Sequence, residues 1–421
     1  MKNAWAVGCA LLCLGMFSMG CSSDDDKDNE DERADAAIVS DAGNAEQGDA
    51  GDKDAASPPV ERDGFTHYTA QQGLPAYSAG SQVRVHDFSG DSAGNLWVAG
   101  YDGVYLLRAG EARFEKLTAA DGLTDYPYIS IAGLGAGEAI VGMEGVFEGQ
   151  EDNDSEAALK SGGADRVKLD GGDLDVEHYV MGTEPGVAFP NGRYKIRSVF
   201  TIRPDYEGDH AGDIWFGGNH GVALWQASER TLLEHRAATI SANGIEMHGD
   251  FWGLAIAPSG DVWIGGAHRE GRIQYGQNGD FNAPLDPVID AWPDASATDR
   301  TDDHVKAMAV SPSGTVWIGS TLNGLASYDP EANTFTYYTV ADGLPGESVT
   351  ALAADPDGTI WVGSWTGLGR FDPATRQWSY VRHLGQGLPT DEIVSLQIDP
   401  RTSPRTLYIG TLKGVSVYRG D

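Results

Sequence analysis

The sequence predicts an all-β fold, a seven-bladed β-propeller of four-stranded antiparallel blades, and three observations support this prediction. A GxxWxG-like motif occurs seven times, with its aromatic position at Trp97, Ile140, Trp215, Trp263, Trp317, Trp361 and Tyr408. Five of the six spacings between these positions are 43 to 54 residues, which suits one blade per repeat. The last repeat also lacks a fourth strand, which the N-terminal part of the chain can supply.

One repeat, residues 305–348, shows how each blade is built. Short alternating runs predict strands at 305–310, 315–319, 324–328 and 334–339. Turn-forming residues such as Ser-Pro-Ser-Gly separate the strands, which indicates an antiparallel meander. The repeated tryptophans occupy one position per blade, so we expect them to pack between sheets.

The ends of the chain predict how the ring closes. The last repeat stops after its third strand, at 414–420, and residues 64–78 match the fourth strand and exit loop of a complete repeat. We therefore expect the N-terminal strand to complete the last blade and cover edges that would otherwise be open.

The remaining spacing, 75 residues between Ile140 and Trp215, allows two interpretations. The first interpretation is an eighth blade, because residues 180–187 resemble residues 408–415. The other is an insertion at 146–165 between the second and third strands of the second blade, since 166–181 reads as a third and fourth strand. The second interpretation requires no missing strands, so seven blades are predicted.

The first 62 residues divide into two segments. Residues 1–21 begin with a basic residue, continue with a short apolar run and end in Ser-Met-Gly-Cys, which is typical of a signal peptide. This ending resembles a bacterial lipobox, so Cys21 is the predicted lipidation site, and Ser22 is compatible with transport to the outer membrane. Residues 22–62 hold 14 acidic and 4 basic side chains, which predicts a disordered stalk before a propeller at 63–421.

Composition limits the partners of the predicted propeller. The formal net charge of the chain is −34, which disfavours nucleic acid because its binding needs Lys and Arg against phosphates. A small molecule, a neutral glycan, a cation or an envelope protein fits better. Cys9 and Cys13 lie in the apolar run that would be removed, which leaves Cys21 as the one cysteine of the expected mature chain, so we expect no intramolecular disulfide. We expect a monomer attached to the membrane through the lipid on Cys21.

The segment DPDGTIWVGSWTGLGRFDP (355–373) and its relatives resemble the two-component regulator propeller repeat. This resemblance implies an extracytoplasmic recognition module, for which glycans are one ligand class. We expect no kinase segment, so we do not expect the signalling role of that family to be carried over intact. The expected function is therefore non-enzymatic binding of a ligand or protein, with an envelope scaffold as one alternative.

We expect ligands on the face that carries the loops between strands two and three and between consecutive blades. Reading those loops gives aromatic, polar, basic and histidine candidates: Tyr101, Asp102, Tyr126, Arg193, Tyr194, Asn219, His220, His248, His268, Arg269, His304, Asn323, Trp365 and Lys413. Such side chains suit sugar stacking or cation capture. The excursions 148–165 and 282–303 depart from the repeat, and both are expected on this face.

A second resemblance supplies an enzymatic alternative. Residues 260–275 are similar to repeats of streptogramin B lyase, which implies a metal-assisted elimination by a histidine and a glutamate. The residues that would do this are His248 or His304 with Glu246 or Glu270. No cofactor is firmly implied by the sequence, and calcium or magnesium stays an open expectation, because no spacing motif specific for either ion is present.

Overall fold

The computed structural model describes residues 58–62, 64–79, 81, 84–124, 127–145, 162–171, 173–179, 196, 198–219, 221–236, 247, 250–266, 269–292, 304–381 and 388–419. All of these belong to one compact unit, Asp54–Asp421, which is separate from Met1–Lys53. The predicted signal peptide, Cys21 and residues 22–57 of the predicted stalk lie outside the described residues. Within the described ranges, no helix has both the length and the apolar character needed to cross a membrane.

The described strands form seven antiparallel sheets, so the predicted seven-bladed propeller is confirmed. Blades 1 and 2 contain β3 (Val85–Gly90), β4 (Leu96–Gly100), β5 (Gly103–Leu107), β6 (Glu115–Leu117), β7 (Tyr128–Gly133), β8 (Glu138–Met143), β9 (Ala164–Asp170) and β10 (Asp173–Tyr179). Blades 3 and 4 contain β11 (Val199–Pro204), β12 (Ile214–Gly218), β13 (Gly221–Gln226), β14 (Thr231–Arg236), β15 (Phe251–Ile256), β16 (Val262–Gly266), β17 (Glu270–Ile273) and β18 (Val288–Ile289).

Blades 5 and 6 follow the same pattern with β19 (Val305–Val310), β20 (Val316–Ser320), β21 (Gly324–Asp329), β22 (Thr334–Tyr338), β23 (Val349–Ala354), β24 (Ile360–Ser364), β25 (Gly367–Asp372) and β26 (Gln377–Val381). Blade 7 contains β27 (Ile393–Asp399), β28 (Thr406–Thr411) and β29 (Gly414–Arg419). The first strand of each blade contacts the first strands of the blades on both sides, and β27 contacts β3. The seven first strands therefore surround a central channel.

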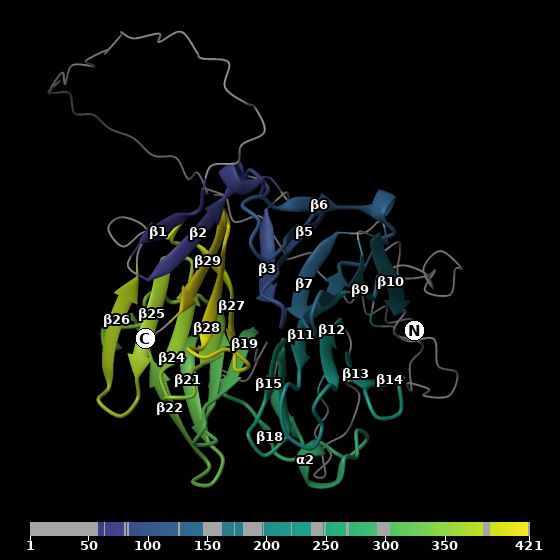
Figure 1. Cartoon of the computed structure of the whole chain (residues 1–421). Helices are drawn as coiled ribbons and strands as arrows, with labels where there is room; N and C mark the ends of the chain where they lie inside the picture. Colours follow the sequence, from purple (N-terminus) through teal and green to yellow (C-terminus); the bar gives the residue numbers. More distant parts are fainter. Residues whose placement is uncertain are drawn as a thin grey trace, which may run out of the picture. The chain divides into compact units, whose positions relative to one another are not determined.

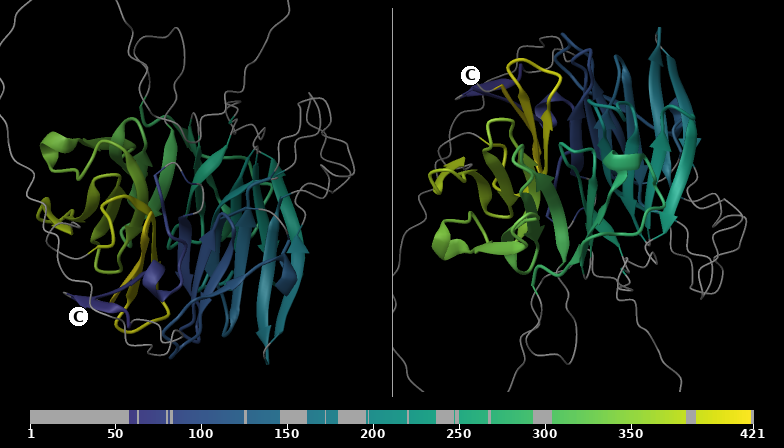
Figure 2. Two further views of the ribbon diagram at one scale, coloured as in Figure 1. Left: turned by 90° about the horizontal axis from the view of Figure 1, so that it is seen from above. Right: turned by 90° about the horizontal axis from the view of Figure 1, so that it is seen from below.

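The N-terminal strand closes the ring, as the sequence predicts. In blade 7, β2 (Phe65–Thr69) pairs with β29, so that Phe65 lies opposite Tyr418. The purple N-terminal strands lie beside the yellow C-terminal strands in both Figure 1 and Figure 2. A further strand, β1 (Val60–Arg62), pairs with β2 and makes this sheet five-stranded. The strand β1 thus lies within the range expected to be stalk.

A local motif shapes three of the loops that join consecutive blades. The short 3-10 helices η1 (Ala70–Gln72), η2 (Ala119–Asp121) and η3 (Val340–Asp342) each follow a threonine that forms a capping box. Each ends at a glycine in the left-handed region, with φ of 95°, 98° and 103° at Gly73, Gly122 and Gly343. Only glycine adopts this conformation without steric cost, so the repeated Thr-x-x-x-Gly pattern specifies the turn.

The repeated tryptophans pack between blades. Trp97, Trp215, Trp263, Trp317 and Trp361 are at most 4% exposed. Trp317, for example, makes an edge contact with Phe371 of blade 6, with ring centroids 5.8 Å apart. These contacts confirm the predicted structural role of the motif, and they bury the large aromatic surfaces that stabilise neighbouring sheets against each other.

Two long departures from the repeat lie at opposite ends of the blades. The insertion in blade 2 falls between β8 and β9, as predicted, although β9 already begins at Ala164. The excursion near residue 282 differs from its prediction, because residues 274–287 connect β17 to β18 and so lie at the end opposite the expected face. There α2 (Tyr275–Asn278) contributes the Tyr275 hydroxyl, which donates to Asp213 of blade 3 at 2.8 Å. These extra residues therefore pack neighbouring blades together.

Candidate functional site at the two ends of the channel

Each first strand runs from one end of the channel to the other. We call the end at which these strands begin the upper end. In an antiparallel meander the loops between strands two and three, and those between blades, also lie at this upper end. The turns between strands one and two, such as residues 311–315, lie at the lower end.

All seven first strands carry a register shift near the upper end. In every blade one residue of the first strand lacks a direct partner on the second strand, between Phe251 and Gly253 in blade 4, for example. The seven unpaired residues are His86, Ile129, Phe200, Trp252, Lys306, Thr350 and Val394. A β-bulge redirects a side chain locally, and here it gives the upper end a ring of seven chemically different residues.

Three of these residues, from adjacent blades, form a cluster that we call the aromatic mouth: Phe200, Trp252 and Lys306. The rings of Phe200 and Trp252 lie 5.8 Å apart at an angle of 47°. The Lys306 Nζ lies 5.9 Å from the centroid of the Trp252 ring, within cation–π range. Both rings are half-buried, and the lysine is exposed. The mouth thus presents aromatic surface beside a positive charge.

Asp250 lies immediately before β15, beside this mouth. Burial raises the pKa of its carboxyl to about 6, although the charge of Lys306 acts in the opposite direction. Its backbone forms a bridge with Asn219, the residue that follows β12. The Asn219 Oδ1 in turn accepts a hydrogen bond from the Ser198 backbone N–H at 2.7 Å. Since Asn219 is 1% exposed, its observed contacts hold the loop that positions Asp250.

Tyr101 and Asp102 lie in the upper loop of blade 1. Burial raises the pKa of the Tyr101 hydroxyl, and the charge and hydrogen bond of Glu144 in blade 2 raise it further. The Tyr101 ring is 5.8 Å from that of His86. Asp102 accepts from the Tyr105 hydroxyl at 2.9 Å and pairs with Lys116 at 2.5 Å. Tyr101 therefore adjoins the ring of bulge residues, whereas Asp102 is engaged on the surface of its own blade.

The remaining described candidates are spread over the upper loops. Asn323 and Lys413 are exposed, and Trp365 is 44% exposed. Leu322 and Val340 of blade 5 are also exposed, at 57% and 50%, so the upper loops of blades 5 and 6 carry several exposed apolar side chains. Arg269 is half-buried beside β17. Tyr126, Arg193, Tyr194, His220, His248 and His268 lie outside the described residues.

Two of the four residues of the lyase hypothesis are described. Glu270 is 0% exposed, within β17 and opposite Ile289 of β18. His304 precedes β19 with a φ of 44°, and its carbonyl accepts from the Thr321 N–H at 3.1 Å. Glu246 and His248 lie outside the described ranges, so this hypothesis stays a prediction. Among the described residues, no three His, Cys, Asp or Glu side chains gather as a metal site.

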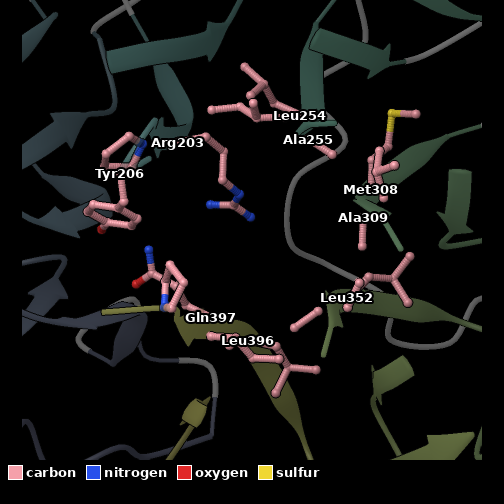
Figure 3. Close-up of a pocket in the computed structure, with 16 residues that line it drawn as sticks. Arg203, Tyr206, Leu254, Ala255, Met308, Ala309, Leu352, Leu396 and Gln397 are labelled. Atoms are coloured by element: carbon pink, nitrogen blue, oxygen red, sulfur yellow. The ribbon is translucent and has the colours of Figure 1, made fainter. Parts of the chain in front are cut away.

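The lower end contains a cavity of about 200 Å³. One side of its wall is apolar, from Leu254, Met308, Leu352 and Leu396, and the other side contains Arg203, Tyr206 and Gln397. Figure 3 shows these side chains around a common space, with the Arg203 guanidinium directed into it. The cavity thus combines one cationic group with apolar walls.

Tyr206 and Arg401 stack beside this cavity. The Arg401 Cζ lies 4.1 Å from the centroid of the Tyr206 ring, and the tyrosine hydroxyl donates to the Gly133 carbonyl at 2.8 Å. Arg401 also forms two hydrogen bonds with Asp399, from Nε at 2.8 Å and from Nη2 at 2.9 Å. Burial raises the pKa of Tyr206 to about 12, so its hydroxyl stays protonated as a donor. This stack links blades 2, 3 and 7.

Comparison with known proteins now supports the fold assignment. Residues 343–366 match the two-component regulator propeller family. This match confirms the resemblance for one copy of the repeat. The matched residues include β23 and β24, the two inner strands of blade 6. No curated protein matches the chain.

Solved structures show the same architecture over most of the chain. The extracellular domain of the one-component system BT4673 from B. thetaiotaomicron is 15% identical with a TM-score of 0.53, covering 82% of this chain and 40% of its own. That of the hybrid two-component system BT3049 from the same organism is 15% identical at 0.52, covering 87% and 42%. Virginiamycin B lyase from Staphylococcus aureus is 12% identical at 0.51, covering 85% and 100%.

These similarities concern the fold. The chain spans about two fifths of the length of the two B. thetaiotaomicron domains. It is a β-propeller like the extracellular domains of those sensor systems, and the same architecture also occurs in a lyase. The fold therefore leaves the function to be argued from the side chains of this chain.

Sequence reasoning did not find the bulge residues Phe200 and Trp252 or the lower-end residues Arg203, Tyr206 and Gln397. A signal was present in the aligned repeats. The position opposite the blade tryptophan is alanine in three successive blades, at Ala255, Ala309 and Ala353, whereas Arg203 and Gln397 occupy it in blades 3 and 7. Comparing first strands rather than loops would have revealed this change.

Proposed function

We propose that this protein is an exported, lipid-anchored binding module that recognises a neutral glycan through the upper end of its channel and performs no chemistry. The aromatic mouth is the observation that carries this proposal. Sugar rings stack on aromatic faces through their C–H groups, and half-buried rings lose little freedom on binding. Phe200 and Trp252 offer two such faces from adjacent blades.

The polar groups around the mouth are suited to sugar hydroxyls. Asp250 supplies carboxylate acceptors on one side, and Lys306 supplies ammonium donors beside the Trp252 ring. Convergent polar groups around an apolar surface are typical of small-molecule sites. Because the Asp250 pKa is about 6, the proposed contact would change its hydrogen-bonding role between pH 5 and 7.

The location and the anchor rest on different observations. The lipobox-like ending at Cys21 supports lipidation, and the acidic segment after it supports a spacer between membrane and propeller. The related folds from B. thetaiotaomicron are extracellular domains, which agrees with an exported position. The net charge of −34 supports a neutral or cationic ligand over an anionic polymer.

The test compares two tryptophans at the upper end. Calorimetric titration with neutral hexasaccharides such as cellohexaose, laminarihexaose and maltohexaose would first identify a bound sugar. Trp252→Ala should then weaken its binding by about 10-fold or more, as expected for the loss of about 1.5 kcal/mol of aromatic contact.

Trp365→Ala is the matched control, because Trp365 is more exposed and lies in the loop of blade 6. We expect this variant to bind within about 2-fold of the wild type. Equal losses in the two variants would place the site on the outer loops instead. Absence of binding to any neutral oligosaccharide by the wild-type protein would contradict the glycan proposal.

A further inference from the structure

The cavity at the lower end is a second candidate site, separate from the aromatic mouth. Seven equivalent positions lie opposite the aromatic position of the repeat motif, and the last five of them line the cavity: Ser89, Ala132, Arg203, Ala255, Ala309, Ala353 and Gln397. Five of these residues are small, which leaves space in the channel. Arginine in blade 3 introduces the one cation at this level.

The carboxylate of Asp87 is the nearby counter-charge of Arg203, but the two side chains do not form a direct ion pair. Its hydrogen bond within the described part of the chain runs from Nη1 to the Ile202 carbonyl at 2.9 Å. Asp87 is near enough to influence it electrostatically, yet no ion pair within 4.0 Å joins the two among the described residues. The Asp87 carboxylate instead accepts from the backbone N–H groups of Phe88 at 2.9 Å and Ile131 at 3.0 Å. Donors of Arg203 therefore remain available toward the cavity.

Arg401 provides an internal comparison with Arg203. Both arginines lie at the lower end, but Arg401 is held by Asp399, by the Leu134 and Gly90 carbonyls and by the Tyr206 ring. Arg401 thus has a structural role, whereas the Arg203 guanidinium is directed toward the space between the cavity-lining side chains in Figure 3. A cation kept in a partly desolvated position favours an anionic partner.

Gln397 lies on the same wall, and its buried Oε1 makes no hydrogen bond within the described residues. Buried polar atoms are normally hydrogen-bonded, and an amide oxygen is an acceptor, so this side of the cavity is suited to a bound water that donates to Oε1. The opposite wall, from Leu254, Met308 and Leu352, offers apolar contacts.

We propose that the lower end of the channel binds a small monocarboxylate with a short apolar chain. The carboxylate would receive the two parallel N–H groups of Arg203, which match its geometry. The chain would lie against the alanine-lined and leucine-lined wall. A volume of about 200 Å³ corresponds to about seven water molecules, which admits an acid of six to eight heavy atoms rather than an oligosaccharide.

The chemistry of the walls distinguishes this ligand from other anions. Inorganic phosphate would gain the arginine contact but would leave the apolar wall in contact with water. An alcohol of the same length would cover the apolar wall but would form no direct ionic contact with the guanidinium. Hexanoate can contact both the guanidinium and the apolar wall. The proposal does not depend on the glycan site, because the two sites lie at opposite ends of the first strands.

The experiment titrates the full folded protein with hexanoate, hexanol and inorganic phosphate, by calorimetry and by ligand-observed NMR. We expect hexanoate to bind with a Kd of about 1 mM and the other two at least about 10-fold more weakly. Arg203→Gln should weaken hexanoate binding by about 10- to 100-fold, as for loss of charge-assisted hydrogen bonds.

Two further variants keep the result interpretable. Ala309→Leu should fill the cavity and weaken hexanoate binding without removing any charge, which keeps the test valid if Arg203→Gln unfolds. Lys413→Gln removes one positive charge from an exposed upper loop and should leave binding within about 2-fold of wild type. Thermal unfolding of each variant checks that it is folded.

Four outcomes would overturn the proposal. These are no hexanoate binding by the wild type, equal binding by Arg203→Gln, equal binding of hexanol, or equal binding of phosphate. If Arg203→Gln loses hexanoate binding but retains oligosaccharide binding, the result would support the monocarboxylate proposal. Failure of every oligosaccharide to bind would affect only the glycan proposal, so the two failures are distinguishable.

Discussion

The upper and lower ends of the channel are built from the same seven strands, yet their side chains follow different rules. At the upper end a bulge in each blade adds one residue, and the seven residues range from Trp252 to Thr350. At the lower end the strands are regularly paired, and most equivalent positions hold small side chains. Where the strands are regularly paired, equivalent residues occupy the same packing environment in every blade. The bulge residue has no direct partner on the second strand, so its identity can differ from blade to blade.

This difference indicates where function can arise in a repeated fold. A residue that packs between blades, such as Trp317, is constrained by both neighbouring sheets. Bulge residue Trp252 and cavity-lining residue Arg203 are only half-buried, so we expect their positions to tolerate change more readily. Phe200 and Trp252 at one end, and Arg203 at the other, are departures of this kind.

The largest effect should come from the structural arginine at the lower end. Arg401→Met leaves Asp399, which is 3% exposed, without its cationic partner, and it also removes the contact with Tyr206. We expect a loss of about 3–5 kcal/mol in the free energy of unfolding, measured by urea denaturation. Arg370→Met, in a more exposed pair with Asp357, is the control and should cost about 1 kcal/mol or less. Similar costs for both variants would show that the lower-end stack is not structural.

A smaller effect should come from the close approach of blades 1 and 2. A Cβ on Gly133 would lie 2.1 Å from the Gly90 carbonyl oxygen, so Gly133→Ala requires a backbone shift at the lower end. We expect a cost of about 2–3 kcal/mol, seen as a lower urea midpoint. A Cβ on Gly135 would meet only the movable end of Glu138, so Gly135→Ala serves as the control. Equal midpoints for both variants would indicate that these strands can separate freely.

The smallest effect concerns the upper end and depends on pH. The Asp250 pKa is about 6 in the folded protein and about 3.9 in an unfolded chain, so the folded state holds the proton more strongly. Its contribution to stability is therefore lost as pH rises from about 4 to 6. The free energy of unfolding of Asp250→Asn should be higher than that of the wild type by about 1–2 kcal/mol at pH 8. The difference should be smaller at pH 4.5.

Urea denaturation at pH 4.5, 6 and 8 measures this difference. Asp102→Asn is the control, because Asp102 lies in a surface pair with Lys116. A constant difference between Asp250→Asn and wild type at all three pH values would contradict the raised pKa.

Periodicity predicted the architecture because it records packing that every blade shares. The motif spacing predicted seven blades, the matching ends predicted the closure by β2, and the irregular spacing predicted the insertion before β9. The same reasoning placed the whole 282–303 excursion at the upper end, whereas residues 282–287 lie at the lower end. The reason is that β17 is only four residues long, so the connection after it begins earlier than the repeat implies.

The site was harder to predict for a physical reason. Loop residues such as Asn323 and Lys413 stand out in a sequence, but whether they face a channel depends on loop conformation. Asn219 shows this limit, since it is buried and bonded to Ser198 rather than directed outward. Phe200 and Trp252 were overlooked because an aromatic residue in a strand is expected to pack in the core, and only the bulge reveals otherwise.

The most direct test of the account is a two-variant cycle on the ends of the channel. Binding of the oligosaccharide identified by titration, and of hexanoate, would be measured calorimetrically for wild type, Trp252→Ala, Arg203→Gln and the double variant. The account predicts that Trp252→Ala weakens only oligosaccharide binding, that Arg203→Gln weakens only hexanoate binding, and that the double variant shows both losses without further change. Loss of both ligands in either single variant would contradict two separate sites.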